Sequence, residues 1–351
     1  HFNHENPAMS TTAQPRLFGE HFLLALTADE RATLERMRAL CRDQFGPKAA
    51  EVARQDTFAW DTFRTLAREG IVATAFPRDY GSSDARQVLR TRLIEEAARV
   101  CSTTASLITG TDLSTRAIVA GGSEALKREI VPRLLTGELQ SAFGLTEPGA
   151  GSDVRGLRTT FRREGDGYVI NGRKKFITRA STADWMVIVG RREDDAGTFM
   201  AALVPRDAPG LSISAEDGKL GWWGVPISSL ELREVRAPMS HRLGEEGEGF
   251  SLAQDALLRA RIGHAAMALG RAMGAVEIAA TYATDRQSFG KPLAAHQGVQ
   301  WMLSDMVTQI EAGRALLNVT AEKYDRGDAD VAVYASMAKQ HATDLGMKVA
   351  T

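Results

Sequence analysis

The run Phe143–Asp153, FGLTEPGAGSD, decides the fold, and the other segments are arranged around it. It begins as a short strand and ends in a turn that proline and glycine punctuate. Gly149 and Gly151 let the backbone take a positive φ or approach a bound group closely. The hydroxyls of Thr146 and Ser152, together with free backbone N–H groups, can bind an electron-rich ligand edge or a phosphate.

The segment Gly165–Thr178 follows and carries an aromatic ring and a hydroxyl at strand spacing. Its turn residues predict a hairpin at Gly165–Gly167 and a second turn at Asn171–Gly172. Phe176 and Thr178 lie two residues apart, so a strand would point both toward one face. An aromatic plane and a hydroxyl beside a donor-rich turn suit a flat heteroaromatic cofactor.

Bulk composition excludes several classes of protein. The 351 residues are enough for two or three domains, and 44% hydrophobic with 25% charged residues is typical of a globular protein. A net charge of −1 recruits neither nucleic acid nor an anionic membrane. The only cysteines, Cys41 and Cys101, exclude a disulfide framework and favour a reducing compartment. No apolar run reaches membrane-span length, and together with the cysteine usage this leads us to expect a cytoplasmic protein. The scattered histidines predict no metal site.

The N-terminal part of the chain is predicted to be helical. Residues 1–26 are interpreted as a tag and N-terminal tail, since HFNHENPA precedes Met9. Residues 27–138 repeat apolar side chains at i, i+3 and i+4, and Thr27–Glu30 has the pattern of a helix start. These residues form the predicted N-terminal helical domain.

Residues 139–246 change to a strand-like period and form the predicted central domain. Trp222 and Trp223 could contact a ligand there, although adjacent aromatics on a β domain more often pack in a core or an interface. Short, evenly spaced strands favour a small barrel or sandwich. The predicted strands are Thr159–Arg162, Tyr168–Ile170, Trp185–Val189, Met200–Val204 and Leu230–Glu234.

Residues 247–351 return to a helical, alanine-rich pattern. Gly263, Gly270 and Gly274 lie inside the first helix, and small residues at this spacing predict close helix crossing in a bundle or a subunit interface. Two more helices are predicted at Gly298–Tyr324 and Ala329–Val349. Their apolar stripes are expected in the core and consist of Met302, Met306, Ile310 and Leu317 in one and Tyr334, Met337 and Leu345 in the other.

Taken together, these motifs resemble those of the FAD-dependent acyl-CoA dehydrogenase family. The GLTEPGAGSD run is followed at the family spacing by FIT, and Arg286–Gly290, RQSFG, is followed by Gln297 eleven residues after the arginine. The resemblance extends from the N-terminal helices to Val349. It implies an α+β fold with an N-terminal helical domain, a central β-barrel or sandwich domain and a C-terminal helical bundle, in a homotetramer or dimer with FAD between subunits.

The resemblance also assigns residues to the cofactor. Phe176 would stack on the flavin ring and Thr178 would donate toward its N5/O4 edge, while Ser152 and Arg261 would bind substrate. Arg286 would contact the pyrophosphate of a neighbour's FAD, because the forked geometry of a guanidinium suits phosphate oxygens. The residues that would line the flavin are Phe143, Leu145, Thr146, Gly151 and Ser152, and those that would reach the neighbour's FAD are Arg286, Phe289 and Gln297.

The implied reaction is the α,β-dehydrogenation of an acyl thioester, either acyl-CoA or acyl-carrier-protein. A carboxylate removes the α-proton while the β-hydrogen leaves as hydride to flavin N5, and donors stabilise the enolate-like oxygen. The electrons then pass to an electron-transfer flavoprotein or another acceptor.

The sequence departs from the family pattern at the catalytic base. The family usually carries a glutamate in a tail after the last helix, which we expect beyond Thr351. Some members place the base near the position of Ala260, where this chain reads LRAR without a carboxylate. Glu147 and Asp153 are structural or turn-shaping in the family, so the catalytic residue is unknown. Leu258 stands where many CoA-using members have an aspartate, which leaves room for a carrier-protein thioester.

Two other interpretations of the sequence remain. One is a flavin oxidase or monooxygenase on the same fold, which would differ in how fast reduced flavin reacts with oxygen. The other is a non-catalytic flavin- or DNA-binding member, which would need a basic surface that the net charge of −1 does not indicate. His264 is expected to be a packed or interface histidine, and no Gly-x-Gly-x-x-Gly nucleotide motif is present.

Overall fold

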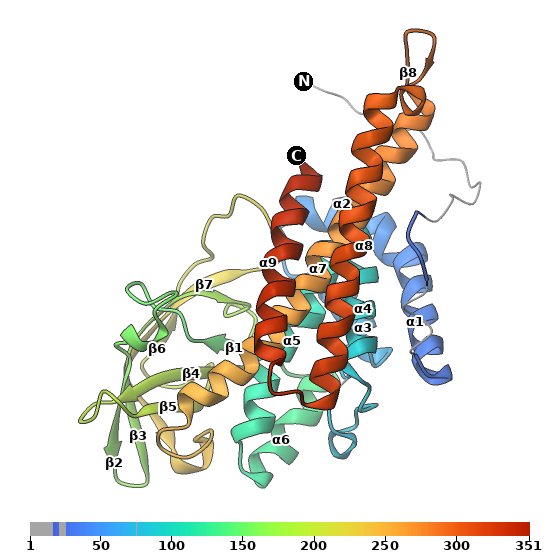
Figure 1. The fold of residues 1–351 in the computed structure, drawn as a ribbon. Coiled ribbons are helices and arrows are strands. Elements are labelled where there is room, and N and C mark those ends of the chain that lie inside the picture. The colour runs from blue at the N-terminus through green and yellow to red at the C-terminus, as the bar shows by residue number, and fades with distance from the viewer. Residues whose placement is uncertain (1–16, 21–25, 75) are drawn as a thin grey trace.

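The computed structural model describes residues 17–20, 26–74 and 76–351, and the chain runs from helices through a sheet to helices (Figure 1). Most of the predicted tail, residues 1–16 and 21–25, lies outside the described residues. The first helices are α1 (Ala28–Leu40), α2 (Gly46–Gln55), α3 (Trp60–Arg68), α4 (Gln87–Val100), α5 (Ser102–Gly121) and α6 (Glu124–Leu135), with a π-helix at Cys41–Phe45. The last helices are α7 (Gly249–Asp285), α8 (Gln297–Arg326) and α9 (Val331–Ala350).

The predicted start of α1 is confirmed. Thr27 Oγ1 accepts from the backbone N–H of Glu30, and Glu30 Oε2 accepts from the N–H of Thr27, which forms a capping box. Each bond satisfies one of the donors that a helix start leaves free. Glu30 also accepts from Arg86, which precedes α4, so the cap connects two helices.

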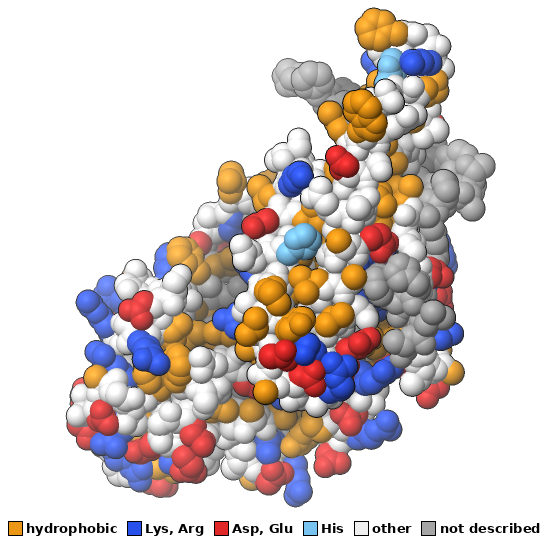
Figure 2. Space-filling view, in the orientation of Figure 1, with side chains coloured by type: hydrophobic (Ala, Val, Ile, Leu, Met, Phe, Trp, Pro, Cys, Tyr) orange, Lys and Arg blue, Asp and Glu red, His pale blue; other side chains and the backbone are white. Residues whose placement is uncertain are grey.

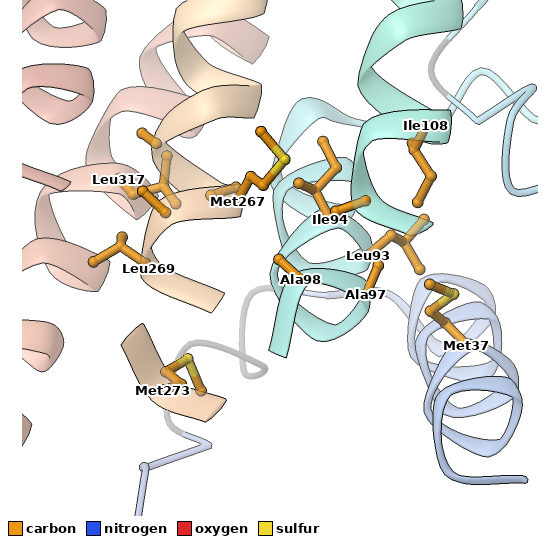
Figure 3. Packing of buried hydrophobic residues seen from close by; sticks show 14 of the residues in the cluster. Met37, Leu93, Ile94, Ala97, Ala98, Ile108, Met267, Leu269, Met273 and Leu317 are labelled. Atoms are coloured by element: carbon orange, nitrogen blue, oxygen red, sulfur yellow. The ribbon is translucent and has the colours of Figure 1, made fainter. Parts of the chain in front are cut away.

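The helical core brings together the first and the last helices. Figure 3 shows Met37 of α1, Leu93 and Ile94 of α4, and Met267 of α7 among the buried side chains of this cluster. α4 contacts α1, α5, α7 and α8, so it is central to the core. The N-terminal and C-terminal helices therefore bury their apolar faces against each other.

The glycines of α7 fit the predicted close crossing. A Cβ added at Gly270 would lie 2.2 Å from the carbonyl oxygen of Glu95, and one at Gly274 would lie 2.1 Å from that of Arg99. Both partners belong to α4, so the prediction of close helix packing is confirmed within the chain. Only a residue without a side chain lets the two helices approach this closely.

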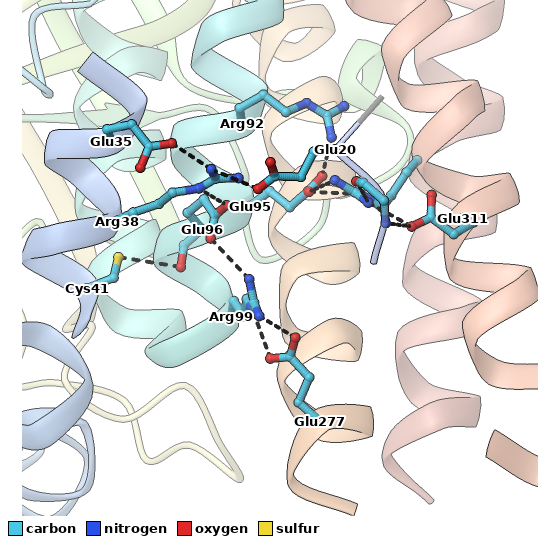
Figure 4. Close-up of polar contacts among 12 residues, drawn as sticks. Glu20, Glu35, Arg38, Cys41, Arg92, Glu95, Glu96, Arg99, Glu277 and Glu311 are labelled. Carbon is cyan, nitrogen blue, oxygen red and sulfur yellow. Dashed lines mark hydrogen bonds and ion pairs between the residues drawn. The ribbon is translucent and has the colours of Figure 1, made fainter. Parts of the chain in front are cut away.

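Ion pairs surround α4 where it meets its neighbours (Figure 4). Glu96 Oε1 accepts from Arg38 of α1 at 2.8 Å, and Arg99 donates to Glu277 of α7 at 2.7 Å. Arg314 of α8 donates to the buried carboxylate of Glu95 at 2.9 Å. These pairs fix the order in which three helices pack around α4.

The central sheet has seven strands in the order β1-β4-β2-β3-β7-β6, with β5 paired to β4. Side chains from six of them meet in one buried cluster, as in a barrel-like arrangement. The predicted α+β fold is therefore confirmed. The strands are β1 (Ser141–Gly144), β2 (Thr160–Glu164), β3 (Gly167–Thr178), β4 (Trp185–Arg192), β5 (Phe199–Pro205), β6 (Leu211–Ile213) and β7 (Ile227–Pro238).

One predicted turn is wrong. β3 continues through Asn171–Gly172, and its register against β7 shifts there instead of reversing. The amide of Asn171 bonds across to Glu234, both to the backbone N–H and to the carboxylate. A Cβ at Gly172 would lie 2.3 Å from Thr159 Oγ1, so the absence of a side chain lets β3 pack closely against Thr159. β3 thus runs unbroken from the Gly165–Gly167 hairpin to Thr178.

The α7–α8 pair projects away from the sheet and ends in a small hairpin, β8 (Gln287–Ser288) and β9 (Lys291–Pro292) (Figure 1). Hydrophobic side chains gather on this projecting end (Figure 2). Among the described residues no helix is long and apolar enough to cross a membrane. The exposed large hydrophobic residues of the projection are Ile278, Tyr282, Phe289, Trp301 and Met302.

Candidate functional site

The turn after β1 forms one wall of the candidate site. Glu147 and Ala150 exchange two backbone hydrogen bonds at 3.0 and 3.1 Å, which closes the turn around exposed Pro148 and Gly149. The sequence predicted either a positive φ at Gly149 and Gly151 or a close approach of a bound group. Neither glycine has a positive φ, so the first of these is wrong. A Cβ at either position would have no atom within 4 Å. The chain's own packing leaves both glycines beside open space, which suits the close approach of a bound group.

A buried ion pair fastens this turn to β3. Lys174, fully buried, donates to Glu147 Oε1 at 2.7 Å and to the carbonyl oxygen of Leu145 at 3.1 Å. The same carboxylate accepts from Thr159 Oγ1 at 2.6 Å and from the backbone N–H groups of Thr159 and Arg158. The turn and the end of β3 therefore form one rigid unit.

The electrostatics of this pair favour a structural role for Glu147 over a role as proton acceptor in catalysis. Burial opposes its ionisation, but the charge of Lys174 and the Thr159 and Arg158 donors outweigh burial and hold the pKa of Glu147 below its usual value. Burial in turn lowers the pKa of Lys174 to about 8. Lys174, Thr159 and Arg158 all donate to the oxygens of Glu147, which supports a structural role for this carboxylate.

The end of β3 presents the predicted aromatic ring. Phe176 has a φ of 58° and is 62% exposed, whereas its neighbour Ile177 is buried. Thr178 is partly exposed, so burial alternates along these three residues. Lys175 Nζ lies 5.0 Å from the centre of the Phe176 ring and pairs with Asp217 at 2.9 Å. One face of the ring thus has a cation beside it, and the ring remains accessible.

Arg179, which follows Thr178, was not singled out from the sequence. Its buried guanidinium donates to Thr111 Oγ1 of α5 at 2.8 Å and lies 5.2 Å and 5.3 Å from the ring centres of Phe58 and Phe63. Burial lowers the pKa of Arg179 to about 9. Gly110 provides the space that the Arg179 side chain occupies, because a Cβ there would lie 3.1 Å from Arg179 Cδ. Arg179 thereby fixes the end of β3 against α5, and no sequence signal indicated this contact.

The other predicted residues of this wall are close in sequence but differ in exposure. Leu145 is buried, Phe143 and Thr146 are partly buried, and Ser152 is exposed. The backbone of Lys175 donates to the carbonyl oxygen of Thr146 at 2.9 Å, which places the turn directly beside the Phe176 segment. The structure thus brings the turn residues and the end of β3 together.

The predicted substrate residue Arg261 is exposed on α7. Leu258, one turn earlier, packs partly buried against the helical core. The carbonyl oxygen of Ala260 lies 2.7 Å from His264 Nδ1, so Nδ1 is the donor in this contact. His264 is partly buried and meets Trp222 edge-on, and both tryptophans of the predicted pair are exposed at their edges (Trp222 37%, Trp223 49%).

Arg286, Phe289 and Gln297 lie at the opposite end of the molecule, around the β8–β9 hairpin (Figure 1). Arg286 and Gln297 are exposed, and Phe289 is 95% exposed with a φ of 51°. The turn at Phe289–Gly290 has two positive φ angles, as in a two-residue hairpin. Within one chain the structure does not bring these three residues to the Phe176 wall.

The wall has the features that a flavin ring needs. It offers an accessible aromatic plane at Phe176, hydroxyls at Thr178 and Ser152, and open space beside Gly151. A flat heteroaromatic ring with hydrogen-bonding edges matches this combination. Among the described residues no group of three or more His, Cys, Asp or Glu is placed to hold a metal ion.

Comparisons with known proteins assign the family. The chain matches the acyl-CoA dehydrogenase N-terminal domain at residues 27–138, the middle domain at 142–235 and the C-terminal domain at 247–351. It is 36% identical over 330 residues to cyclohex-1-ene-1-carbonyl-CoA dehydrogenase of Geobacter metallireducens, covering 93% of this chain and 87% of that protein.

Solved structures agree with this assignment. Butyryl-CoA dehydrogenase from Megasphaera elsdenii superposes with a TM-score of 0.88 at 31% identity, covering 92% of this chain and 86% of that chain. A chain in the structure of the electron transferring flavoprotein of Acidaminococcus fermentans gives 0.88 at 30% identity, with the same coverage of 92% and 86%. The predicted family is confirmed: this chain belongs to the acyl-CoA dehydrogenases.

Proposed function

We propose that this chain binds FAD and dehydrogenates an acyl-CoA thioester between its α and β carbons. The observation that carries the proposal is the rigid unit of the Thr146–Asp153 turn and the end of β3, with open space at Gly151 next to the exposed ring of Phe176. Membership of a family of acyl-CoA dehydrogenases supports the reaction class. A flavin, when bound, supplies the acceptor for the β-hydrogen.

The residues of the chain bind and orient the cofactor and the thioester substrate. Phe176 offers a plane for stacking, and Thr178 offers a hydroxyl beside it. Phe143, Leu145, Thr146, Gly151 and Ser152 line the remaining wall of the cofactor site, and Ser152, which is exposed, also reaches the arm of the thioester. Arg261 provides an exposed guanidinium on α7 for the same substrate. No base is assigned, because Glu147 is held by its structural partners and the described part of α7 near Ala260 has no carboxylate.

We further propose that each cofactor site is shared between two chains. Arg286, Phe289 and Gln297 are exposed on the projecting α7–α8 end, far from the Phe176 wall of their own chain (Figure 1). A guanidinium suits the pyrophosphate of the dinucleotide. The exposed hydrophobic residues around the same end fit burial against a second copy, in a homodimer or homotetramer.

The substrate and acceptor follow from the relatives as proposals. Relatives are named for cyclohex-1-ene-1-carbonyl-CoA and butyryl-CoA, which supports CoA as the carrier. An electron-transfer flavoprotein is the proposed acceptor, supported by the similar chain in the Acidaminococcus fermentans structure. Cys41 and Cys101 are both buried and unpaired, and burial raises the pKa of Cys41 to about 12, as expected for structural thiols in the cytoplasm.

The test is an anaerobic titration of the FAD-loaded protein with a panel of acyl-CoA and acyl-carrier-protein thioesters. We expect one acyl-CoA to bleach the flavin absorption and to yield its enoyl product. A protein that takes up no FAD, or whose flavin stays oxidised with every thioester, contradicts the proposal. Rapid reoxidation of the reduced flavin by oxygen would instead indicate the oxidase or monooxygenase interpretation.

A further inference from the structure

The helices α4 and α5 hold a group of buried polar side chains that has no role in the proposed reaction. It consists of Gln87 and Arg90 on α4 and of Asp112 and Thr115 on α5, and we call it the α4–α5 polar cluster. All four side chains belong to residues that are between 0% and 4% exposed. The two residues on each helix lie three positions apart, so they occupy one face of that helix.

The antiparallel arrangement of the two helices places the four side chains at two adjacent levels. A single residue, Cys101, joins α4 to α5, and Arg90 Nη2 lies 3.4 Å from Asp112 Oδ1 on the returning helix. Arg90 and Asp112 therefore form one level of the interface. One helical turn further from Cys101, α4 carries Gln87 and α5 carries Thr115, which form the next level.

The cluster has more hydrogen-bonding atoms than partners within the chain. Arg90 Nη2 donates to the carbonyl oxygen of Ile108 at 3.0 Å, but Arg90 Nη1 has no hydrogen-bond partner among the described residues. The same holds for both side-chain atoms of the Gln87 amide and for the hydroxyl of Thr115. Native proteins rarely leave buried donors unpaired, because such a donor loses its hydrogen bonds to water without replacement. A small bound group between these side chains would supply the partners.

The charges favour an anion as this bound group. Among the described residues Arg90 has one carboxylate partner, Asp112, whose Oδ2 also lies 3.1 Å from Arg259 Nε of α7. Two guanidinium groups thus share one buried carboxylate. The next ion pair along α5, between Arg116 and Asp255 at 3.0 Å, is balanced by itself. Burial lowers the pKa of Arg90 to about 10, so its guanidinium is still charged at neutral pH.

Two acidic groups near the cluster already have other roles. Asp325 of α8 accepts from the backbone N–H groups of Gln87 and Val88 at 2.6 and 3.1 Å, so it caps the start of α4 and makes no ion pair with Arg90 among the described residues. Asp112 Oδ1 makes no hydrogen bond, but it lies at the level of Arg90 and not at that of Thr115. Neither carboxylate therefore occupies the place between Arg90 Nη1 and Thr115.

We infer that the α4–α5 polar cluster binds one halide ion, such as chloride, between Arg90 Nη1, the amide of Gln87 and the hydroxyl of Thr115. The guanidinium, the amide nitrogen and the hydroxyl all supply hydrogen-bond donors. A halide would also add the negative charge that two guanidinium groups on one carboxylate lack, whereas water would satisfy only the hydrogen bonds. The inference is independent of the proposed reaction, because no residue of the cluster is assigned to FAD or to the thioester.

Bromide locates such a site directly. Crystals of the FAD-loaded protein are grown in sodium bromide, and anomalous diffraction is recorded at the bromine absorption edge. We expect an anomalous peak between Arg90 Nη1 and Thr115 Oγ1, and chloride density at the same place in crystals grown in sodium chloride. Ordered water at this place in both salts, without an anomalous peak, overturns the inference.

Thermal unfolding in solution measures the affinity. The midpoint of unfolding of the FAD-loaded protein is recorded in mixtures of sodium chloride and sodium gluconate at constant ionic strength. An ion that binds only the folded state raises the midpoint with the logarithm of its concentration once that concentration exceeds the dissociation constant. The same midpoint in chloride and in gluconate would contradict a halide site.

Thr115→Val removes one donor and nearly keeps the shape of the side chain. We expect the dissociation constant of chloride to rise roughly tenfold, as the loss of one hydrogen bond to a charged group predicts. The matched control is Thr91→Val, because Thr91 is equally buried on α4 but its hydroxyl donates to the carbonyl oxygen of Val88 at 2.8 Å. This control should bind chloride like wild type. If Thr115→Val does so too, any bromide peak is an adventitious ion only and the inference fails.

Discussion

Glu147 fastens the turn after β1 to β3 through the buried ammonium of Lys174 and the donors of Thr159 and Arg158. Sequence comparison with the family indicated only that this glutamate is structural. The partner lies 27 residues further along the chain, so the spacing of neighbouring residues could not identify it. Its identification needed the sheet register that places β3 beside the turn.

Replacing Glu147 with glutamine is expected to destabilise the fold by about 3–5 kcal/mol, because Lys174 is left as a buried charge without its counter-ion. Chemical denaturation of wild type and variant measures the difference. Glu138→Gln, which removes an exposed ion pair with Arg133, is the control and should change little. Equal stability of Glu147→Gln and wild type would contradict a structural role for the buried pair.

The same variant should alter the dependence of stability on pH. The pKa of Glu147 is lower in the folded chain than its usual value of 4.5. A carboxylate with a depressed pKa stabilises the fold fully above the unfolded value and loses that contribution as the pH falls through the folded value. The stability difference between wild type and Glu147→Gln should therefore shrink as the pH falls below about 4.5. A difference that does not change in acid would refute this assignment.

Gly151 tests the cofactor wall at the scale of a single residue. Since a Cβ there meets no atom within 4 Å, Gly151→Leu should leave the free energy of unfolding within about 1 kcal/mol of wild type. The new side chain occupies the space proposed for the flavin, so FAD content after purification should fall severely. Gly218→Leu, at another open glycine outside the wall, should retain FAD. Full FAD content in Gly151→Leu would show that the cofactor lies elsewhere.

At the scale of helices and strands, the periodic segments could be predicted from the sequence. The predictions failed where contacts between distant elements decide the structure. Asn171–Gly172 has turn residues, yet the amide of Asn171 bonds to Glu234 on β7 and the strand continues. Met302 and Met337 follow helical spacing but are 66% and 42% exposed, whereas Ile310 and Leu317 of the same pattern are buried. Periodicity identifies an apolar face but not whether a neighbouring helix covers its whole length.

The crossing of α7 and α4 provides the test at this scale. Gly270→Ala gains helix propensity of roughly 1 kcal/mol, but its Cβ would lie 2.2 Å from the carbonyl oxygen of Glu95. We expect the clash to dominate, with a lower midpoint of thermal unfolding than wild type. Gly298→Ala in α8 has no atom within 4 Å and should instead be neutral or stabilising. A more stable Gly270→Ala protein would mean that the two helices can separate freely.

At the scale of the whole molecule, the two signatures of the sequence lie at separate ends of one chain. The Phe176 wall is on the sheet, and Arg286 is on the projecting α7–α8 end (Figure 1). The sequence pattern identified both signatures, but their separation could be seen only in the folded chain. If both contact one dinucleotide, the sites must be formed between copies of the chain.

Subunit mixing tests this central claim most directly. Gly151→Leu disables the wall and Arg286→Glu disables the projecting end, so each variant alone should purify with little FAD. Co-expressed chains that pair at random should regain about a quarter of the wild-type FAD content, because a mixed pair contains one site with both parts intact. No gain over the single variants, or an Arg286→Glu protein that retains FAD fully, would contradict a site shared between chains.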